Sequence, residues 1–125
     1  MKKISIAFLL LLLIGLSQYR AKATCMETDR RDINLDTALR ANLIINDGVT
    51  YIVTRNLTLG ASDTIKIYDG GTLIVDGGTI QNACFQLMSG SLLIVKNNGS
   101  IYMASEKTLE APVGALVNIE YGTIN

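Results

Sequence analysis

The sequence contains no histidine and only two cysteines among its 125 residues. Without histidine, a Ser-His-Asp or Cys-His nucleophile system is excluded, and two cysteines alone do not complete a tetrahedral zinc site. The sequence also lacks a phosphate-binding loop motif and the G-G-x-G-x-D tandem repeat of calcium-binding solenoids. We therefore expect no metal and no cofactor.

Pairs of carboxylates are the remaining route to catalysis, because glycosidases act through Asp or Glu. Asp69 and Asp76 each precede a glycine, but Asp-Gly is ordinary turn chemistry. Neither acid recurs in the repeat copies described below, where Ser89 and Lys96 take their places. We predict that both aspartates serve turns and that the chain has no catalytic residues.

The longest apolar run is too short to span a membrane. It covers Ile4 to Leu16, about 13 residues, whereas a membrane helix needs about 20. Lys2 and Lys3 precede this run, and Ala21-Lys22-Ala23 follows it as an A-x-A cleavage pattern. The sequence therefore predicts a signal peptide over residues 1–23 and a secreted, periplasmic or cell-surface location.

Removal of this leader changes the charge of the chain. It takes away four of the 11 basic residues and none of the 11 acidic ones, which leaves a formal charge near −4. A mildly acidic mature chain has no electrostatic footprint for nucleic acid. We expect no nucleic-acid partner and no membrane span after cleavage.

The two cysteines, Cys25 and Cys84, both follow the predicted cleavage site. In an exported protein they can form one disulfide that closes a long loop. Alternatively both stay as thiols, with Cys84 buried as a small apolar residue. Both alternatives remain open, because the sequence does not fix the distance between the two residues.

Three similar segments follow one another: "GGTLIVDGGTI", "GSLLIVKNNGSI" and "GALVNIEYGTI". A period of 20 to 50 residues is typical of stacked repeat architectures. The aligned apolar columns are Leu73, Leu93 and Val117; Val75, Val95 and Ile119; and Ile80, Ile101 and Ile124. The corner glycines align as Gly70, Gly90 and Gly114, and as Gly78, Gly99 and Gly122.

Apolar residues alternate within each copy, which predicts short strands separated by glycine turns. No single copy can bury its inward side chains alone, so the copies must stack into one core. We predict an all-β fold, a short right-handed parallel β-helix (β-solenoid) of about four coils. Glycine at each corner is expected to supply a positive φ.

The remaining segments are assigned around this core. Residues 47–125 form the solenoid, in which Gly48 to Thr64 is an earlier, weaker coil. Residues 24–46 form an irregular polar cap over the first coil, since solenoid ends need polar covers. Within the cap, Asp36 to Arg40 is expected to form one helical turn and Leu43 to Ile45 a first strand.

The last copy runs almost to Asn125 with no polar cover after it. An exposed strand edge is a template for pairing with another chain. Three explanations remain open: the last coil is itself the cap, this uncapped C-terminal coil self-associates or docks on a protein partner, or the reading frame was cut short.

The segments "GGTLIVDGGTIQNA" and "EAPVGALVNIEYGTI" resemble the β-helix segments of secreted and surface proteins of Bacteroidota, which often carry "G-x-L-x-V-D-G-G-T-[IL]-x-N-A-C". The resemblance covers about Thr50 to Ile124. It implies a stalk, adhesin-like or scaffold region, of a kind that accompanies separate catalytic or sorting domains. This chain has no evident domain of either kind.

The sequence therefore predicts a non-enzymatic exported β-solenoid that acts as a structural scaffold or adhesion module at the cell surface. Two alternatives remain. One is a carbohydrate-binding module, with Tyr51, Tyr68, Tyr102 and Tyr121 as candidates for stacking on sugars, although they share no column of the alignment. The other is a truncated remnant of a larger β-helix surface protein or polysaccharide-active enzyme.

Overall fold

The structure, a computed structural model, describes residues 29–125, which form strands and turns and no helix. The strands are β1 (Asp29–Ile33), β2 (Thr37–Ala38), β3 (Leu43–Ile45), β4 (Val49–Val53), β5 (Asn56–Thr58), β6 (Ile65–Ile67), β7 (Thr72–Asp76), β8 (Thr79–Ala83), β9 (Phe85–Leu87), β10 (Leu92–Lys96), β11 (Ser100–Met103), β12 (Leu116–Glu120) and β13 (Thr123–Ile124). The predicted signal peptide and the beginning of the predicted cap lie outside the described residues.

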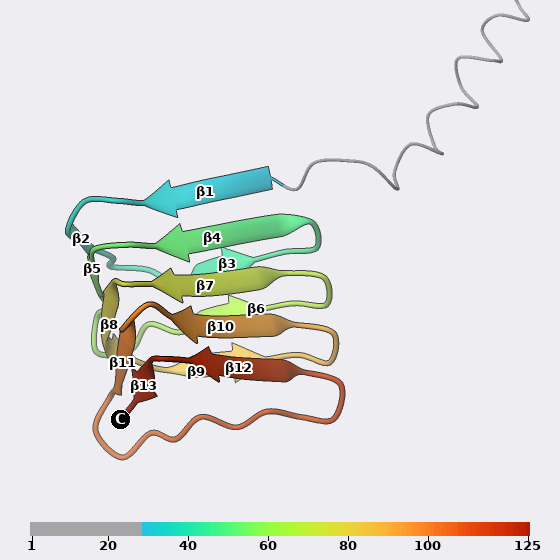
Figure 1. Cartoon of the computed structure of the whole chain (residues 1–125). Coiled ribbons are helices and arrows are strands. Elements are labelled where there is room, and N and C mark those ends of the chain that lie inside the picture. Colours follow the sequence, from blue (N-terminus) through green and yellow to red (C-terminus); the bar gives the residue numbers. More distant parts are fainter. Residues whose placement is uncertain (1–28) are drawn as a thin grey trace, which may run out of the picture.

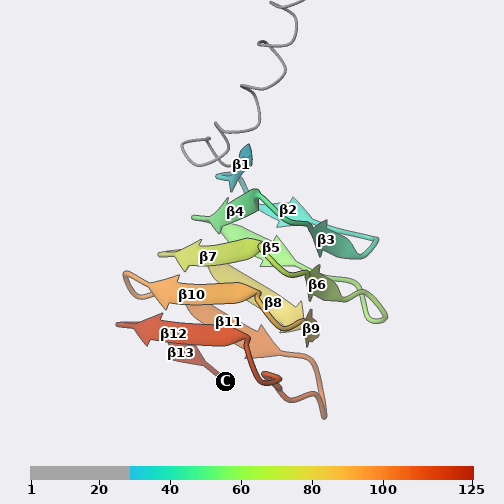
Figure 2. The ribbon, with the colours of Figure 1, turned by 90° about the vertical axis from the view of Figure 1, so that its right-hand side faces the viewer.

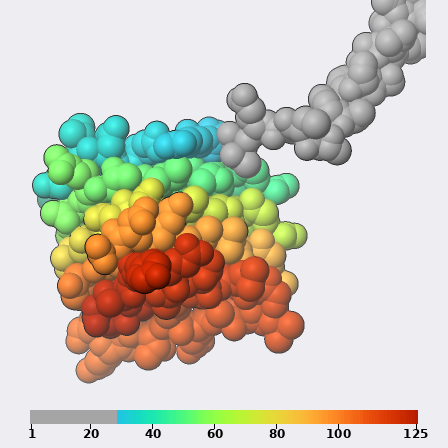
Figure 3. All heavy atoms as spheres, in the orientation of Figure 1, coloured from blue at the N-terminus to red at the C-terminus, as the bar shows by residue number. Residues whose placement is uncertain are grey.

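The strands stack into three parallel sheets along one axis, so the predicted parallel β-solenoid is confirmed (Figures 1 and 2). Sheet A has the order β1-β4-β7-β10-β12, sheet B the order β2-β5-β8-β11-β13, and sheet C the order β3-β6-β9. The first three coils each take one strand from every sheet, and the last two take one strand from sheet A and one from sheet B. Residues 29–125 thus form five coils, where the sequence predicted about four. The colours run from blue at the first coil to orange and red at the last two (Figure 3).

Residues of the aligned sequence columns are neighbours in the ladders. Leu93 of β10 pairs with Leu73 of β7 on one side and with Val117 of β12 on the other. The second column of sheet A, built on Val95, follows the same register. In sheet B, Ile101 pairs with Ile80 and Ile124.

The interior of the solenoid is made of these inward-pointing side chains. In the middle coils they are fully buried: Leu73, Val75, Ile80, Leu93, Val95 and Ile101. Each such side chain contributes roughly 1.5–3 kcal/mol relative to an exposed one. In the last coil the same columns are open, and Ile119 is 48% exposed.

The N-terminal segment differs from the sequence prediction. Residues 29–45, expected to belong to an irregular cap, form a complete coil of β1, β2 and β3 that pairs in parallel with β4, β5 and β6. The helical turn expected at 36–40 was wrong, since β2 is extended there, whereas the strand at Leu43–Ile45 is present. Parallel pairing uses backbone groups, so the polar sequence of β1 does not prevent it.

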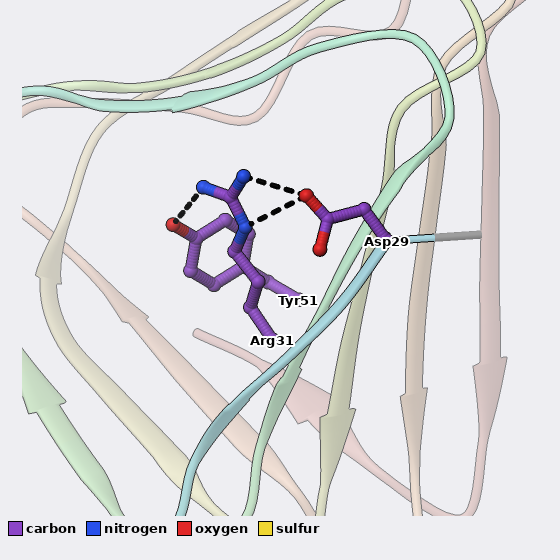
Figure 4. Close-up of polar contacts among 3 residues, drawn as sticks. All are labelled: Asp29, Arg31 and Tyr51. Carbon is purple, nitrogen blue, oxygen red and sulfur yellow. Dashed lines mark hydrogen bonds and ion pairs between the residues drawn. The ribbon is translucent and has the colours of Figure 1, made fainter.

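The polar cover lies within this first strand (Figure 4). Arg31 occupies the inward column beside Tyr51, where later coils carry leucine. Its Nη2 donates to Asp29 Oδ2 at 2.6 Å and its Nη1 to the Tyr51 hydroxyl at 3.4 Å. Its guanidinium carbon lies 5.7 Å from the centre of the Tyr51 ring. Charged and polar groups therefore cover the core at the first coil, whereas buried leucine side chains fill the same column in the third and fourth coils.

The hydrogen bond from Arg31 lowers the pKa of the Asp29 carboxyl and raises the pKa of the Arg31 guanidinium. Because the pKa of Asp29 is lower in the folded chain, its contribution to stability is present at neutral pH and is lost as acid protonates the carboxylate. Both side chains are exposed, so this contribution is small.

Residues 29–125 contain no helix that is long and apolar enough to cross a membrane.

The register predicts a large difference between two adjacent substitutions in β10. Val95→Asp places a charge in the sealed core and should unfold the protein, because an unpaired buried charge costs several kcal/mol. Ile94→Asp places the same charge on the half-buried outer face of sheet A and should leave a cooperative urea transition. A Val95→Asp protein that unfolds at the wild-type urea concentration would contradict the register.

Candidate ligand groove between sheets A and B

Three cavities lie along the corner of the solenoid where sheet A turns into sheet B. Two of them, of about 290 and 310 Å³, share Asp36 and Asn56 and lie over the first three coils. The third, of about 430 Å³, lies over the turns that join β10 to β11 and β12 to β13. The two groups meet where Thr79 pairs with Ser100. We call this row of cavities the corner groove.

Glycines Gly78, Gly99 and Gly122 line the corner groove, but not for the expected reason, since none of them has a positive φ. A Cβ on Gly78 would lie 2.6 Å from the Val53 carbonyl oxygen and 2.7 Å from that of Arg55. At these three positions glycine is required because the preceding coil approaches too closely for a side chain.

The left-handed conformation belongs instead to the residue before each of these glycines. It occurs at Gly77 (φ 74°), Asn98 (φ 68°) and Tyr121 (φ 55°). The other glycine column behaves as predicted, with φ values of 83°, 88° and 95° at Gly70, Gly90 and Gly114. The two glycine columns therefore meet different physical demands, which spacing alone does not distinguish.

Beside the glycines lies a column of short polar side chains. The ladder of sheet B places Thr79 next to Asn56 on one side and next to Ser100 on the other. The Thr123 hydroxyl donates to Ser100 Oγ at 3.3 Å, and Asp36 Oδ1 accepts from the Asn56 backbone N–H at 3.2 Å. We call Asp36, Asn56, Thr79, Ser100 and Thr123 the polar ladder.

Tyr121 stands at the rim of the corner groove and is 87% exposed. Positive φ is a genuine outlier for a bulky residue and costs on the order of 1–3 kcal/mol. Burial does not compensate this cost, because the ring packs against little. The column neighbours of Tyr121 are Gly77 and Asn98, residue types that adopt this conformation readily.

The other tyrosines of the sequence prediction lie elsewhere. Tyr51 is half-buried under Arg31, and Tyr68 is half-buried at the turn after β6. Tyr102, on the outer face of sheet B in the fourth coil, is 42% exposed. Of these four described tyrosines, only Tyr121 is both largely exposed and beside the groove.

Asp69 and Asp76 occupy turns. Asp69 fills the space that a Cβ on Gly90 would take, and Asp47 does the same at Gly70. Asp76 Oδ1 accepts from the Asn97 side-chain amide at 2.6 Å. Asp47 and Asp69 thus hold equivalent positions in adjoining coils, a relation that the sequence alignment missed because its three copies begin at Gly70.

Cys84 is half-buried and forms no disulfide within residues 29–125. The Thr64 hydroxyl donates to its Sγ at 3.8 Å. The predicted partner, Cys25, lies outside the described residues, so the disulfide stays a prediction. The described part of the chain holds no group of three or more His, Cys, Asp or Glu side chains placed to bind a metal ion.

A second cleft, of about 360 Å³, separates β9 from residues 110–112. Leu109 to Ala111 align in sequence with β6 and β9 but form no strand. Tyr68 and Met88 each donate their N–H to the coil before, at 2.9 and 3.0 Å, whereas Pro112 at the equivalent position has no N–H. Sheet C therefore stops at three strands.

No family model matches this chain. No curated protein and no solved structure matches it either. Its function must therefore be inferred from its own residues.

Glycine is needed at Gly78 for lack of space and at Gly77 for a positive φ, and substitutions at these two neighbouring positions can separate the two requirements. Gly78→Ala places a methyl group against backbone atoms and should destabilise the protein by about 1–3 kcal/mol. Gly77→Asn keeps the left-handed conformation that Asn98 adopts in the next coil, and should change stability by less than about 1 kcal/mol. Urea unfolding of both variants tests this assignment, which equal effects would contradict.

Proposed function

We propose that this chain is a non-enzymatic, exported β-solenoid that acts as a structural scaffold or adhesion module at the cell surface. The observation that carries the proposal is the stacking of the inward columns, which commits the repeated residues of the middle coils to a single packed core. The predicted signal peptide supports export. The resemblance to surface β-helix segments of Bacteroidota supports the location.

A non-enzymatic role is supported by the chemistry of the side chains. The sequence has no histidine. Of the acids considered for catalysis, Asp76 is hydrogen-bonded to Asn97 and Asp69 lies at a turn glycine. The structural contacts of these acids account for their presence without a reaction.

The last coil supports association with a second copy of the chain. The inward side chains of β12 are Val117, which is half-buried, and Ile119, which is 48% exposed. Within residues 29–125 no strand pairs with the outer edge of β12. An exposed edge with apolar inward side chains can be extended by another strand.

The first coil is a poor partner for this edge. Its β1 carries the Arg31–Asp29 and Arg30–Asp32 ion pairs, with N–O distances of 2.6 and 3.0 Å. Charges on an edge strand oppose pairing with another chain. A head-to-tail filament would bury these charges against apolar residues, so we expect two copies to meet last coil to last coil.

A two-fold axis at Asn118 suits this arrangement. It would pair β12 antiparallel with β12 of the second copy, and each Val117 would face Ile119 of the other copy. The inward apolar column would then continue across the interface, and the interface would be closed by its own symmetry. Growth would stop at a dimer.

Light scattering on size-separated protein, recovered after expression with its own leader, tests this proposal. The mass should rise from one chain to two across a concentration series. Ile119→Lys should keep the protein at one chain, because a charge at the centre of the pairing strand opposes association.

Leu35→Lys is the matched control, since Leu35 is 69% exposed but lies in the first coil, and this variant should dimerise as the wild type does. Masses beyond two chains would contradict the two-fold arrangement. A single-chain mass at every concentration would contradict self-association.

Carbohydrate binding is a second candidate function. The corner groove, with its polar ladder and exposed Tyr121, favours it.

A further inference from the structure

We propose that the corner groove binds a neutral, linear polysaccharide that lies parallel to the solenoid axis. The inference rests on the proposed role as a surface module and names a ligand for it. Sequence alignment does not find this site, because the site combines the shape of a corner with one residue in an unfavourable conformation.

The polar ladder repeats with the coils. Neighbouring parallel strands lie about 4.8 Å apart, so five coils extend the ladder over roughly 20 Å. That repeat is similar to the length of one sugar ring along a linear chain. Each coil can therefore offer a hydroxyl, amide or carboxylate group to successive sugars of a polymer in the groove.

The residue types suit sugar hydroxyls. Thr79, Ser100 and Thr123 carry hydroxyls that both donate and accept hydrogen bonds, and Asn56 adds an amide that does the same. Thr79 and Ser100 are half-buried, and Thr123 is exposed.

The charges in the groove favour a neutral ligand. Asp36 and Arg55 are the charged residues that line the described groove, and they have opposite signs. The part of the groove between Asn98 and Thr123 is lined by uncharged side chains. An anionic polymer would find no cationic row to bind.

Tyr121 provides the aromatic surface. An exposed ring at the groove rim can stack on the apolar face of a sugar while its hydroxyl stays in water. Its conformation costs stability, whereas Asn98 fills the equivalent position in the coil before without that cost. A bound sugar gives a reason for the ring that packing within the fold does not.

Electrophoresis of the full chain, expressed with its own leader, through native gels containing xylan, hydroxyethyl cellulose, laminarin or galactomannan tests the proposal. At least one neutral polysaccharide should retard the wild-type protein, and polygalacturonate should not. Tyr121→Phe should keep the binding. Tyr121→Asn should weaken it about tenfold while raising the melting temperature, because asparagine adopts positive φ more readily.

A second pair of variants tests the location. Thr79→Lys fills the middle of the groove and should abolish retardation, whereas Gln86→Lys adds the same charge on the exposed face of β9 and should not. The proposal is overturned if no neutral polysaccharide retards the protein, if only polygalacturonate does, or if Tyr121→Asn and Thr79→Lys bind as the wild type.

Light scattering separates this result from the proposed scaffold role. A protein that dimerises but binds no glycan would contradict the proposed polysaccharide binding and leave the proposed dimer standing. A protein that binds glycan as a single chain would contradict the proposed dimer and leave the binding proposal standing.

Discussion

Each coil is joined to the next by parallel ladders of backbone hydrogen bonds. In these ladders, residues at equivalent positions of successive coils pair with one another, as Leu73, Leu93 and Val117 do. This register decides which side chains point inward. A slip of one residue would turn the whole apolar set of a strand outward. The core, the glycine corners and the polar ladder all depend on it, because each is a column that exists only when the coils are aligned.

Alignment of the coils also gives each column a beginning and an end, and the two ends have different chemistry. The inward column that contains Leu73 starts at Arg31, whose hydrogen bonds to Asp29 and Tyr51 close the first coil with charge. The column built on Val95 finishes at Ile119, which is 48% exposed. Charged groups therefore cover the column at one end and apolar side chains are exposed at the other, although the same backbone geometry underlies both.

The stacked fold could be predicted from the sequence because the glycines and β-branched residues that produce it recur at the same positions in three copies. The first coil could not, since β1 reads "DRRDI" and shows no apolar alternation, and only its backbone pairing makes it a coil. The corner groove could be predicted only in part. The sequence names Tyr121 and the glycine column that begins at Gly78, but residue spacing shows neither the left-handed conformation of Tyr121 nor the backbone contacts at Gly78 that bring them to one corner.

Because Pro112 interrupts sheet C, we expect the solenoid to unfold first at its C-terminal end. Within residues 29–125, sheets A and B run through five coils but sheet C stops at β9, so two ladders rather than three join the fourth coil to the third. In a stack whose stability is close to a sum of neighbour terms, the coils with fewer ladders open first. Amide hydrogens of β12 and β13 should therefore exchange with solvent faster than those of β4 and β7. The first three coils can stay folded while the last two unfold locally.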